Sequence, residues 1–350
     1  MKHVRGHEIL PVRTAVVGAN GGHYLQSHQK ELLGESLCQV TALADTRIEN
    51  LTAAEPLSAL ALPSWDAVQA LRTIEAAVIM TGDKTHATFM AEAIQRGWHV
   101  LCEKPLFRTH EEYGRVALAL GVAQAKGLVA LSCHPRRFDP PFMRMKAYVD
   151  NPELVAEDFG VALPQLGKPQ RFAFDFSYPE PRADKAELHD SLRSDHLCHE
   201  IETMDYLFGP SNFNIWALGD GDSNPRAYRV AGQRHADGLH FRFAGTRTKP
   251  ATDRAFEERM TVRFTNGKIS INTYEGVAVF VGADWVPARK RAPELYKTDY
   301  NERFQATNKN FFESIRGLAE PYMTSEELLR CNLADVALRG SMGETVRVVV

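Results

Sequence analysis

Short apolar runs alternate with amphipathic segments through the first 140 residues. The runs that predict buried strands are 13–19, 38–45, 60–63, 76–82, 99–105 and 128–134. Helices are predicted between them at 21–33, from Thr85 to Gly97, and at 109–127. Strands that alternate with helices at this spacing pair in parallel through crossovers. The sequence therefore predicts an α/β domain with a doubly wound sheet.

The pattern changes after this point, where strand-like segments follow one another directly. They are 170–178, 213–219, 228–232, 239–245, 258–267, 268–274 and 277–283. Helices are predicted near 141–150 and at 194–209, 302–317 and 324–340. The stretch "TNGK" at 265–268 is typical of a hairpin. Neighbouring strands favour antiparallel pairing, so we expect an α+β domain, with domain limits of 11–135 and 136–350.

Composition narrows the class of protein. The chain has 350 residues, 44% of them apolar and 24% charged, with a formal net charge of -3, which is typical of a globular protein that binds neither nucleic acid nor anionic lipid. No apolar run approaches the roughly 18 residues of a membrane span. The N-terminal segment lacks the apolar core of a signal peptide. Five cysteines without a C-x-x-C pair indicate reduced thiols, so we expect a cytoplasmic protein.

The turn after the first strand, "GANGGH", carries part of a dinucleotide-binding pattern. That pattern has glycine at its first, third and sixth positions, where this chain has Gly18, Asn20 and His23, with Gly21 and Gly22 between. A tight turn that opens a helix presents backbone N–H groups to a pyrophosphate. A flexible connection between strand and helix would give the same residues, and the turn alone does not separate the two interpretations.

Asp45 ends the second predicted strand, where a carboxylate can accept hydrogen bonds from the adenosine ribose of a dinucleotide. It could instead cap the segment that follows. Arg47 stands two residues on and could bind the 2′-phosphate of NADP. Because the carboxylate would repel that phosphate, the pair favours NAD over NADP.

The segment 194–209, "SDHLCHEIETMDYLFG", predicts a helix with two different faces. At about 100° per residue, Leu197, Ile201, Met204 and Phe208 share one face, and Asp195, His199, Glu202 and Tyr206 share the opposite one. The polar face is either the solvated side of a surface helix or a proton-transfer site, since an acid and a base lie one turn apart.

Histidine and acidic residues are dense around the start of this helix. They are His189, Asp190, Asp195, His196, Cys198 and His199. Their spacing matches neither H-E-x-x-H nor H-x-x-E-H, so no metal site is expected.

Four segments together resemble the glucose–fructose oxidoreductase, inositol dehydrogenase and MocA (Gfo/Idh/MocA) family. They are "THATFMAEAIQRGWHVLCEKPL" from Thr85, "RRFDP" from Arg136, the helix with Asp195 and His199 spaced as D-x-x-x-H, and "RCNLADVALRGSMGETVRV" from Arg330. The resemblance implies a Rossmann domain followed by an α+β domain built on a large, mostly antiparallel open sheet. It also implies NAD(P) as the cofactor, and pairing of chains into a dimer or tetramer through the outer face of that sheet.

The resemblance also implies roles for particular residues. Lys104 of "EKP", Asp195 and His199 are expected to line the catalytic pocket: Lys104 would stabilise negative charge on the reacting oxygen, His199 would exchange its proton, and Asp195 would orient the substrate. A cis peptide is expected before Pro105. Besides the residues already named, Thr81, His86, Glu103 and Lys104 are expected to contact the cofactor. Candidates for substrate contacts are Arg137, His189, Arg193 and His196.

The sequence departs from the family at two places, the glycine turn and the approach to the D-x-x-x-H helix. At the second place His189, Asp190 and Arg193 replace small residues. We expect hydride transfer between nicotinamide and a secondary alcohol or ketone carbon of a sugar, a polyol or a related small molecule. Two alternatives stay open: a hydrolase of the same family that recycles its NAD, and a regulator that senses the dinucleotide without catalysis.

Overall fold

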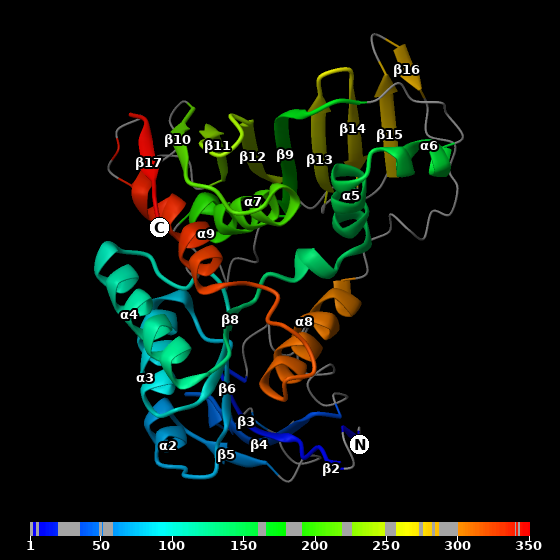
Figure 1. Ribbon diagram of the computed structural model, residues 1–350. Helices are drawn as coiled ribbons and strands as arrows, with labels where there is room; N and C mark the ends of the chain where they lie inside the picture. Colours follow the sequence, from blue (N-terminus) through cyan, green and yellow to red (C-terminus); the bar gives the residue numbers. More distant parts are fainter. Residues whose placement is uncertain are drawn as a thin grey trace. The chain divides into compact units, whose positions relative to one another are not determined.

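The structure is a computed structural model that describes residues 3–4, 7–19, 36–48, 51, 59–159, 166–179, 191–218, 226–248, 257–272, 276–281, 284–286, 300–339, 341 and 344–350. The chain packs into two compact units (Figure 1). The first comprises Met1–Pro135 with Tyr300–Leu329, and the second comprises Arg136–Asp299 with Arg330–Val350. The second unit begins at Arg136, and residues 300–329 group with the first unit. The domain limits of 11–135 and 136–350 stay a prediction.

The first unit is built on a six-stranded sheet in which every pair of neighbours is parallel. Its strands, in spatial order, are β5 (Leu60–Leu62), β4 (Cys38–Ala44), β3 (Val12–Val17), β6 (Ala76–Ile79), β7 (His99–Cys102) and β8 (Ala130–Ser132). The order reverses between β3 and β6, which is the switch point of a doubly wound sheet. All four residues of β6 are buried, as expected for a strand covered on both faces.

The helices of the first unit follow the strands. They are α2 (Trp65–Gln69), α3 (Asp83–Gln95), α4 (His110–Lys126) and α8 (Tyr300–Ile315). The helix predicted from Thr85 begins two residues earlier, because Gly82 takes the N-cap position. The helix predicted at 21–33 lies outside the described residues. A short antiparallel pair, β1 (His3–Val4) and β2 (His7–Glu8), precedes the sheet.

The second unit is built on a nine-stranded sheet that is antiparallel except where β9 and β12 pair in parallel. Its strands, in spatial order, are β16 (Asp284–Val286), β15 (Gly276–Val281), β14 (Gly267–Asn272), β13 (Glu257–Phe264), β9 (Pro169–Pro179), β12 (His240–Thr248), β11 (Ala227–Arg234), β10 (Phe213–Ala217) and β17 (Val346–Val348). Along β13, buried residues alternate with more exposed ones. One face of the sheet is therefore covered and the other meets solvent. Both fold-class predictions are confirmed.

The helices of the second unit are α5 (Pro140–Asp150), α6 (Glu153–Phe159) and α7 (Leu192–Phe208), and α9 (Ser325–Leu338) passes into this unit from the first. The 3₁₀ helix η3 (Pro135–Phe138) stands at the start of the unit. Helix α7 lies along the sheet and contacts β11 and β12 (Figure 1). It carries the D-x-x-x-H residues, so the sheet is the surface that positions them.

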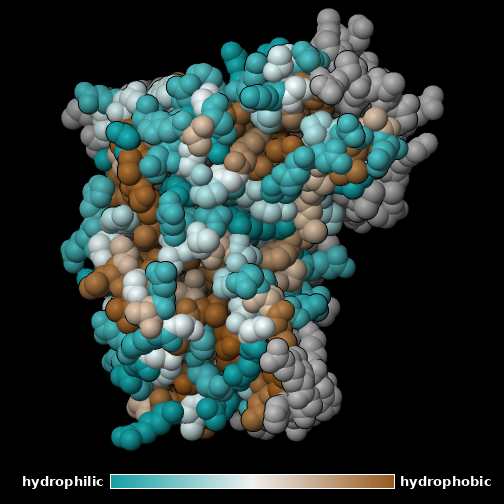
Figure 2. All heavy atoms as spheres, viewed as in Figure 1, coloured by the Kyte–Doolittle hydropathy of each residue, from teal (hydrophilic) through white to brown (hydrophobic). Residues whose placement is uncertain are grey.

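Large apolar side chains are exposed at only a few scattered positions of the described chain, among them Leu10, Leu60 and Leu118. Figure 2 shows hydrophobic residues in several separate places among hydrophilic ones on the face in view. Within the described ranges, no helix combines the length and the apolar character that crossing a membrane requires.

Candidate active site

The turn after β3 is fixed between the ends of two neighbouring strands. Gly18 has φ +85°, and a Cβ atom at this position would lie 2.6 Å from the carbonyl oxygen of Met80. Its N–H group donates to the carbonyl oxygen of Ala44 at 2.8 Å. Only glycine fits both the backbone conformation and the space, which agrees with a tight turn of the dinucleotide-binding type. Asn20, Gly21 and Gly22, which the sequence assigned to the same turn, lie outside the described residues.

Asp45 follows β4 at the same edge of the sheet, and its own N–H donates to Leu62 of β5 at 3.1 Å. One carboxylate oxygen, Oδ1, accepts the N–H of Arg47 at 3.0 Å and lies 4.0 Å from the Arg47 guanidinium. The Arg47 side chain is 63% exposed. Asp45, which favours NAD, and Arg47, which favours NADP, therefore pair with each other at the predicted ribose site.

His86 joins the ends of β6 and β7. Its Nδ1 lies 2.8 Å from the carbonyl oxygen of Pro105, and its Nε2 lies 2.9 Å from that of Thr81. The ring is buried, with 1% of its surface exposed. The hydroxyl group of Thr81 is 2.7 Å from that of Thr85. His86 thus supports the backbone of Thr81, a predicted cofactor residue, and of Pro105, which follows Lys104. Direct contact between the His86 ring and a cofactor stays a prediction.

The "EKP" segment follows β7. Lys104 is half-buried, the Lys104–Pro105 peptide is cis as expected, and the N–H of Lys104 donates to Oε2 of Glu103 at 3.2 Å. Glu103 is buried and interacts with the thiol of Cys133, which follows β8. Burial, and then the charge of Glu103, raise the pKa of Cys133 well above its ordinary value. A protonated thiol is a weak nucleophile, so this environment does not favour a nucleophilic role for Cys133.

A residue far along the chain also meets this edge of the sheet. The hydroxyl group of Tyr322 donates to the carbonyl oxygen of Ser132 and accepts the N–H of His134 at 3.3 Å. These groups stand at the carboxyl end of β8. Tyr322 could not be predicted from the sequence, because nothing local connects it with a strand about 190 positions earlier.

Helix α7 is buried around most of its circumference. It begins after Ser191, whose hydroxyl oxygen accepts the N–H of Ser194 at 3.2 Å. Buried positions include both the predicted apolar face and, on the opposite one, Asp195, His199 and Glu202. The interpretation of that polar face as the solvated side of a surface helix is therefore wrong. Asp195 and Glu202 are also held by basic partners.

Asp195 interacts with two basic groups. Its Oδ2 lies 3.2 Å from Nε2 of His196 and 3.6 Å from the guanidinium of Arg247, which stands near the end of β12. The ring of His196 stacks on that of Tyr178, with centroids 4.5 Å apart. Arg247 was missed because its strand is distant in sequence. These contacts hold the carboxylate in one orientation. The role of Asp195 towards a substrate stays a prediction.

His199 lies one turn further along α7 and exposes 7% of its surface. Its ring centroid is 5.8 Å from that of His196. Arg193, a predicted substrate residue, instead pairs with Asp335 of α9 at 2.7 Å. His189, predicted beside it, lies outside the described residues.

The sheet-facing side of α7 contains a buried ionic cluster that we call the Arg136 cluster. Arg136 donates to Oε1 of Glu258 at 3.0 Å from Nε and at 2.5 Å from a terminal nitrogen, and to Oε1 of Glu200 at 3.3 Å. The hydroxyl group of Tyr178 donates to Glu258 at 2.8 Å, and that of Tyr228 donates to Glu200 at 2.5 Å. Burial raises the pKa of Glu200 to about 7, against the opposing effects of Arg136 and Tyr228.

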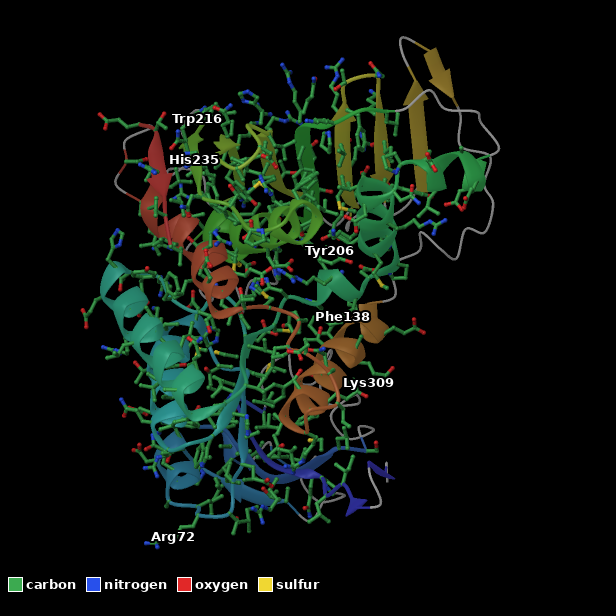
Figure 3. The ribbon with its side chains drawn as sticks, in the orientation of Figure 1. Arg72, Phe138, Tyr206, Trp216, His235 and Lys309 are labelled. Carbon is green, nitrogen blue, oxygen red and sulfur yellow. The ribbon has the colours of Figure 1, made fainter. Side chains whose placement is uncertain are left out.

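Arg137, another predicted substrate residue, binds a different part of α7. Its guanidinium pairs with the buried carboxylate of Glu202 and lies over the ring of Tyr206, 5.4 Å from the centroid. Figure 3 labels Tyr206 on α7 and Phe138 on η3, the segment that carries Arg137. Burial, followed by the charge of Glu202, raises the pKa of Tyr206 to about 12. The Tyr206 hydroxyl group is therefore protonated at neutral pH.

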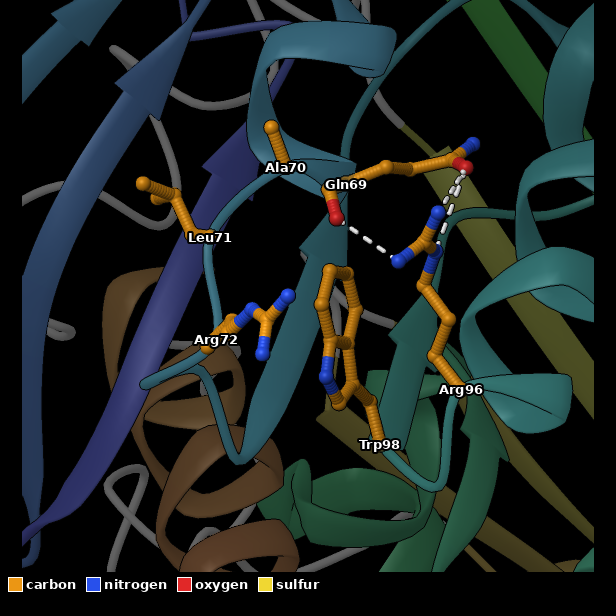
Figure 4. A pocket seen from close by; sticks show the side chains of 6 residues that line it. All are labelled: Gln69, Ala70, Leu71, Arg72, Arg96 and Trp98. Atoms are coloured by element: carbon orange, nitrogen blue, oxygen red, sulfur yellow. Dashed lines mark hydrogen bonds between the residues drawn. The ribbon is translucent and has the colours of Figure 1, made fainter.

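A hollow of about 560 Å³ lies elsewhere, lined by Gln69, Ala70, Leu71, Arg72, Arg96 and Trp98 (Figure 4). Arg96 is held there by three hydrogen bonds to Gln69, of 2.7 to 3.1 Å. These residues precede β6 and β7, whereas ligands of doubly wound sheets bind beyond the carboxyl ends of the strands. The hollow is therefore not the predicted cofactor site.

Lys104 belongs to the first unit, and Asp195 and His199 belong to the second. Their convergence on one substrate atom therefore stays a prediction. Among the residues that the structure describes, no group of three or more histidine, cysteine and acidic side chains is arranged to hold a metal ion. Gly18 and Asp45 fit a dinucleotide, since the first permits the tight turn and the second offers a carboxylate at the adjoining strand end.

Comparison with known proteins adds to this geometry. Residues 12–130 match the family model described as "Oxidoreductase family, NAD-binding Rossmann fold". An inositol 2-dehydrogenase of Rhizobium meliloti is 22% identical over 344 residues, which cover 94% of this chain and 97% of the relative. A crystal structure of a putative myo-inositol dehydrogenase from Sinorhizobium meliloti aligns with a TM-score of 0.69 and 20% identity, covering 97% of this chain and all of the other. A 3-ketoreductase variant from Actinomadura kijaniata, in complex with TDP-benzene and NADP, aligns with a TM-score of 0.70 and 17% identity over 95% and 98% of the two chains.

Proposed function

Residues 12–130 belong to the Gfo/Idh/MocA family of oxidoreductases, and from this premise we propose that the chain transfers hydride between nicotinamide and a secondary alcohol or ketone carbon of a polyol or sugar. The comparisons confirm the prediction of an NAD(P)-dependent oxidoreductase that acts on a small molecule. A cyclic polyol is the first substrate to test, because the relative that covers nearly the whole chain is an inositol 2-dehydrogenase.

Residues of the first unit would hold the cofactor. Gly18 permits the tight turn at the pyrophosphate, and Asp45 would accept hydrogen bonds from the adenosine ribose hydroxyls. NAD is proposed over NADP, because Arg47 is already paired with Asp45 and the carboxylate repels a 2′-phosphate. Thr81, Glu103 and Lys104 follow strands β6 and β7 at the edge where the nicotinamide would bind.

Three side chains would carry the chemistry around the bound substrate. NAD(P), when bound, accepts or supplies the hydride. His199 would take the proton of the substrate hydroxyl, or return it in reduction. Lys104 would stabilise the negative charge that develops on the same oxygen. Asp195, oriented by Arg247 and His196, would accept a hydrogen bond from a neighbouring substrate hydroxyl.

The observation that carries this proposal is the burial of Asp195 and His199 one turn apart on α7, each with 7% of its surface exposed. An aspartate and a histidine are seldom placed together in an interior without a task, because their desolvation is costly. A substrate panel beginning with myo-inositol, read by NADH absorbance, tests the activity. Fluorescence titration with NADH and NADPH tests the cofactor site separately.

The relatives named above are dehydrogenases and a ketoreductase, and they give no support to the hydrolase or the regulator. The panel separates these alternatives. A dehydrogenase produces NADH with the substrate, a hydrolase releases a sugar without net NADH, and a regulator binds the dinucleotide with neither result. A homo-oligomer formed through the outer sheet face and a cytoplasmic location stay predictions.

A further inference from the structure

We propose that Arg136 and Glu200 are positioning residues for His199, which together fix the rotation of α7 about its own axis. The inference rests on the catalytic role proposed above for His199. None of the chemistry assigned so far uses the Arg136 cluster, although all its charged members are buried.

Two consecutive arginines hold α7 on both sides of His199. At 3.6 residues per turn, Glu200 lies about 100° to one side of His199 around the helix, and Glu202 lies about 60° to the other. Arg136 binds Glu200, and Arg137 binds Glu202. Rotation of the helix in either direction moves one of these glutamates away from its arginine. The paired contacts therefore resist rotation in both directions.

Arg136 in turn is fixed to the sheet rather than to the helix alone. Its contacts with Glu258 come from β13, and its contact with the Tyr178 hydroxyl, at 3.2 Å, comes from β9. Its guanidinium also lies over Phe174 of β9, 5.1 Å from the ring centroid. The side chain of Arg136 thus connects α7 to two central strands of the sheet, β9 and β13.

The same cluster reaches the turn of α7 that precedes His199. Tyr178, which donates to Glu258, also stacks on His196. The backbone is therefore held at position 196 by the stacking of His196 on Tyr178 and at position 200 by the hydrogen bond from Arg136 to Glu200, with His199 between. A base must stand within hydrogen-bond reach of its proton, and a displacement of about 1 Å can lower a rate by about 10²-fold.

The test uses Glu200→Gln and Arg136→Lys, each made in the wild type and in a His199→Ala background. Glu200→Gln keeps the shape and the acceptor for Tyr228, and Arg136→Lys keeps the charge but loses the forked geometry. The matched control is Arg242→Lys, because Arg242 pairs with Asp175 at 2.8 Å on a more exposed part of the same sheet. Turnover is measured with NAD and myo-inositol, or with the panel substrate that is oxidised fastest.

A positioning role predicts a loss of turnover of about 10- to 100-fold in the wild-type background, with NADH affinity unchanged. In the His199→Ala background the same changes should cost less than about threefold, because residues that act through one another are not additive. Equal losses in both backgrounds would mean that the cluster only stabilises the fold, and the proposal would be overturned.

A second measurement needs no turnover. In protein labelled with ¹³C at its histidine rings, the His199 signal is assigned by its loss in His199→Gln. Glu200→Gln and Arg136→Lys should shift this signal and leave that of His99, in the first unit, unchanged, whereas Arg242→Lys should shift neither. An unmoved His199 signal would overturn the positioning role. If the signal moves but His199→Ala keeps full turnover, the proposed function of His199 fails instead.

Discussion

The hydroxyl group of Tyr228 donates a hydrogen bond of 2.5 Å to Oε2 of Glu200, and both side chains are buried. Two carboxylates, Glu200 and Glu258, share the single guanidinium of Arg136 in this cluster. If both were ionised, the cluster would carry a net negative charge away from water. Burial raises the pKa of Glu200 to about 7, so this carboxyl takes up a proton as pH falls below that value and relieves the excess negative charge.

This proton makes stability depend on pH. The pKa of Glu200 rises from 4.5 to about 7 on folding, so between these values the folded protein keeps a proton that the unfolded chain releases. The contribution is fully present below pH 4.5 and is lost as pH rises towards about 7, by an amount on the order of 3 kcal/mol. Urea unfolding at about pH 5 and about pH 8 measures it. Glu200→Gln should remove this component, and an identical pH dependence in both proteins would contradict the assignment.

Cofactor preference should depend on Asp45. Asp45→Ala is expected to narrow the ratio of NADPH to NADH dissociation constants, because it removes the repulsion of the 2′-phosphate and releases Arg47 from its pair. Fluorescence titration with both nucleotides gives the ratio. Arg47→Ala is the matched control and should widen it. A wild-type protein that binds NADPH more tightly than NADH would show that Arg47 outweighs Asp45.

Gly18→Ala should destabilise the protein by about 1–3 kcal/mol, because a side chain at φ +85° is strained and its Cβ would lie 2.6 Å from the Met80 carbonyl oxygen. Gly121→Ala, within α4 and with open space around it, should stabilise by about 0.5–1 kcal/mol. Chemical denaturation compares the two. Similar values for both variants would remove the argument for a fixed turn after β3.

Lys104→Ala and His199→Ala should each lower turnover by about 10²- to 10⁴-fold. NADH affinity should change little in either variant, because the roles concern the substrate oxygen. Steady-state rates together with NADH titration separate the two effects. Lys126→Ala, at the end of α4, serves as a control with unchanged turnover. Retention of full activity in Lys104→Ala would exclude the proposed stabilisation of charge on the oxygen.

The parallel sheet could be predicted because its signals are local. Each strand is a short apolar run that ends in a turn, and Gly18, Asp45 and Lys104 mark three strand ends that the structure places on one sheet. Helix α7 was also predicted within two residues at its start, since its apolar residues recur with helical period. Each of these elements can be recognised from the apolar and polar residues within a few positions along the chain.

The Arg136 cluster could not be predicted in this way. Its charged members come from η3, α7 and β13, and no spacing in the sequence connects Arg136, Glu200 and Glu258. The polar face of α7 was equally compatible with water until the sheet supplied its partners. Strand β17 was missed for the same reason, because its three residues become a strand only by pairing with β10, more than 120 positions earlier.

The first unit is completed by residues 300–329, which are synthesised after nearly all of the second. On the ribosome, the six strands of the parallel sheet emerge long before α8, whose following residue Arg316 bonds to the carbonyl oxygen of Leu10 at 3.0 Å and to Glu75 at 3.2 Å. The parallel sheet of the first unit therefore lacks the cover of α8 while the residues of the larger sheet are still being synthesised. Chains stalled before residue 300 should consequently need chaperones more than finished ones, even though every strand of the first sheet is already present.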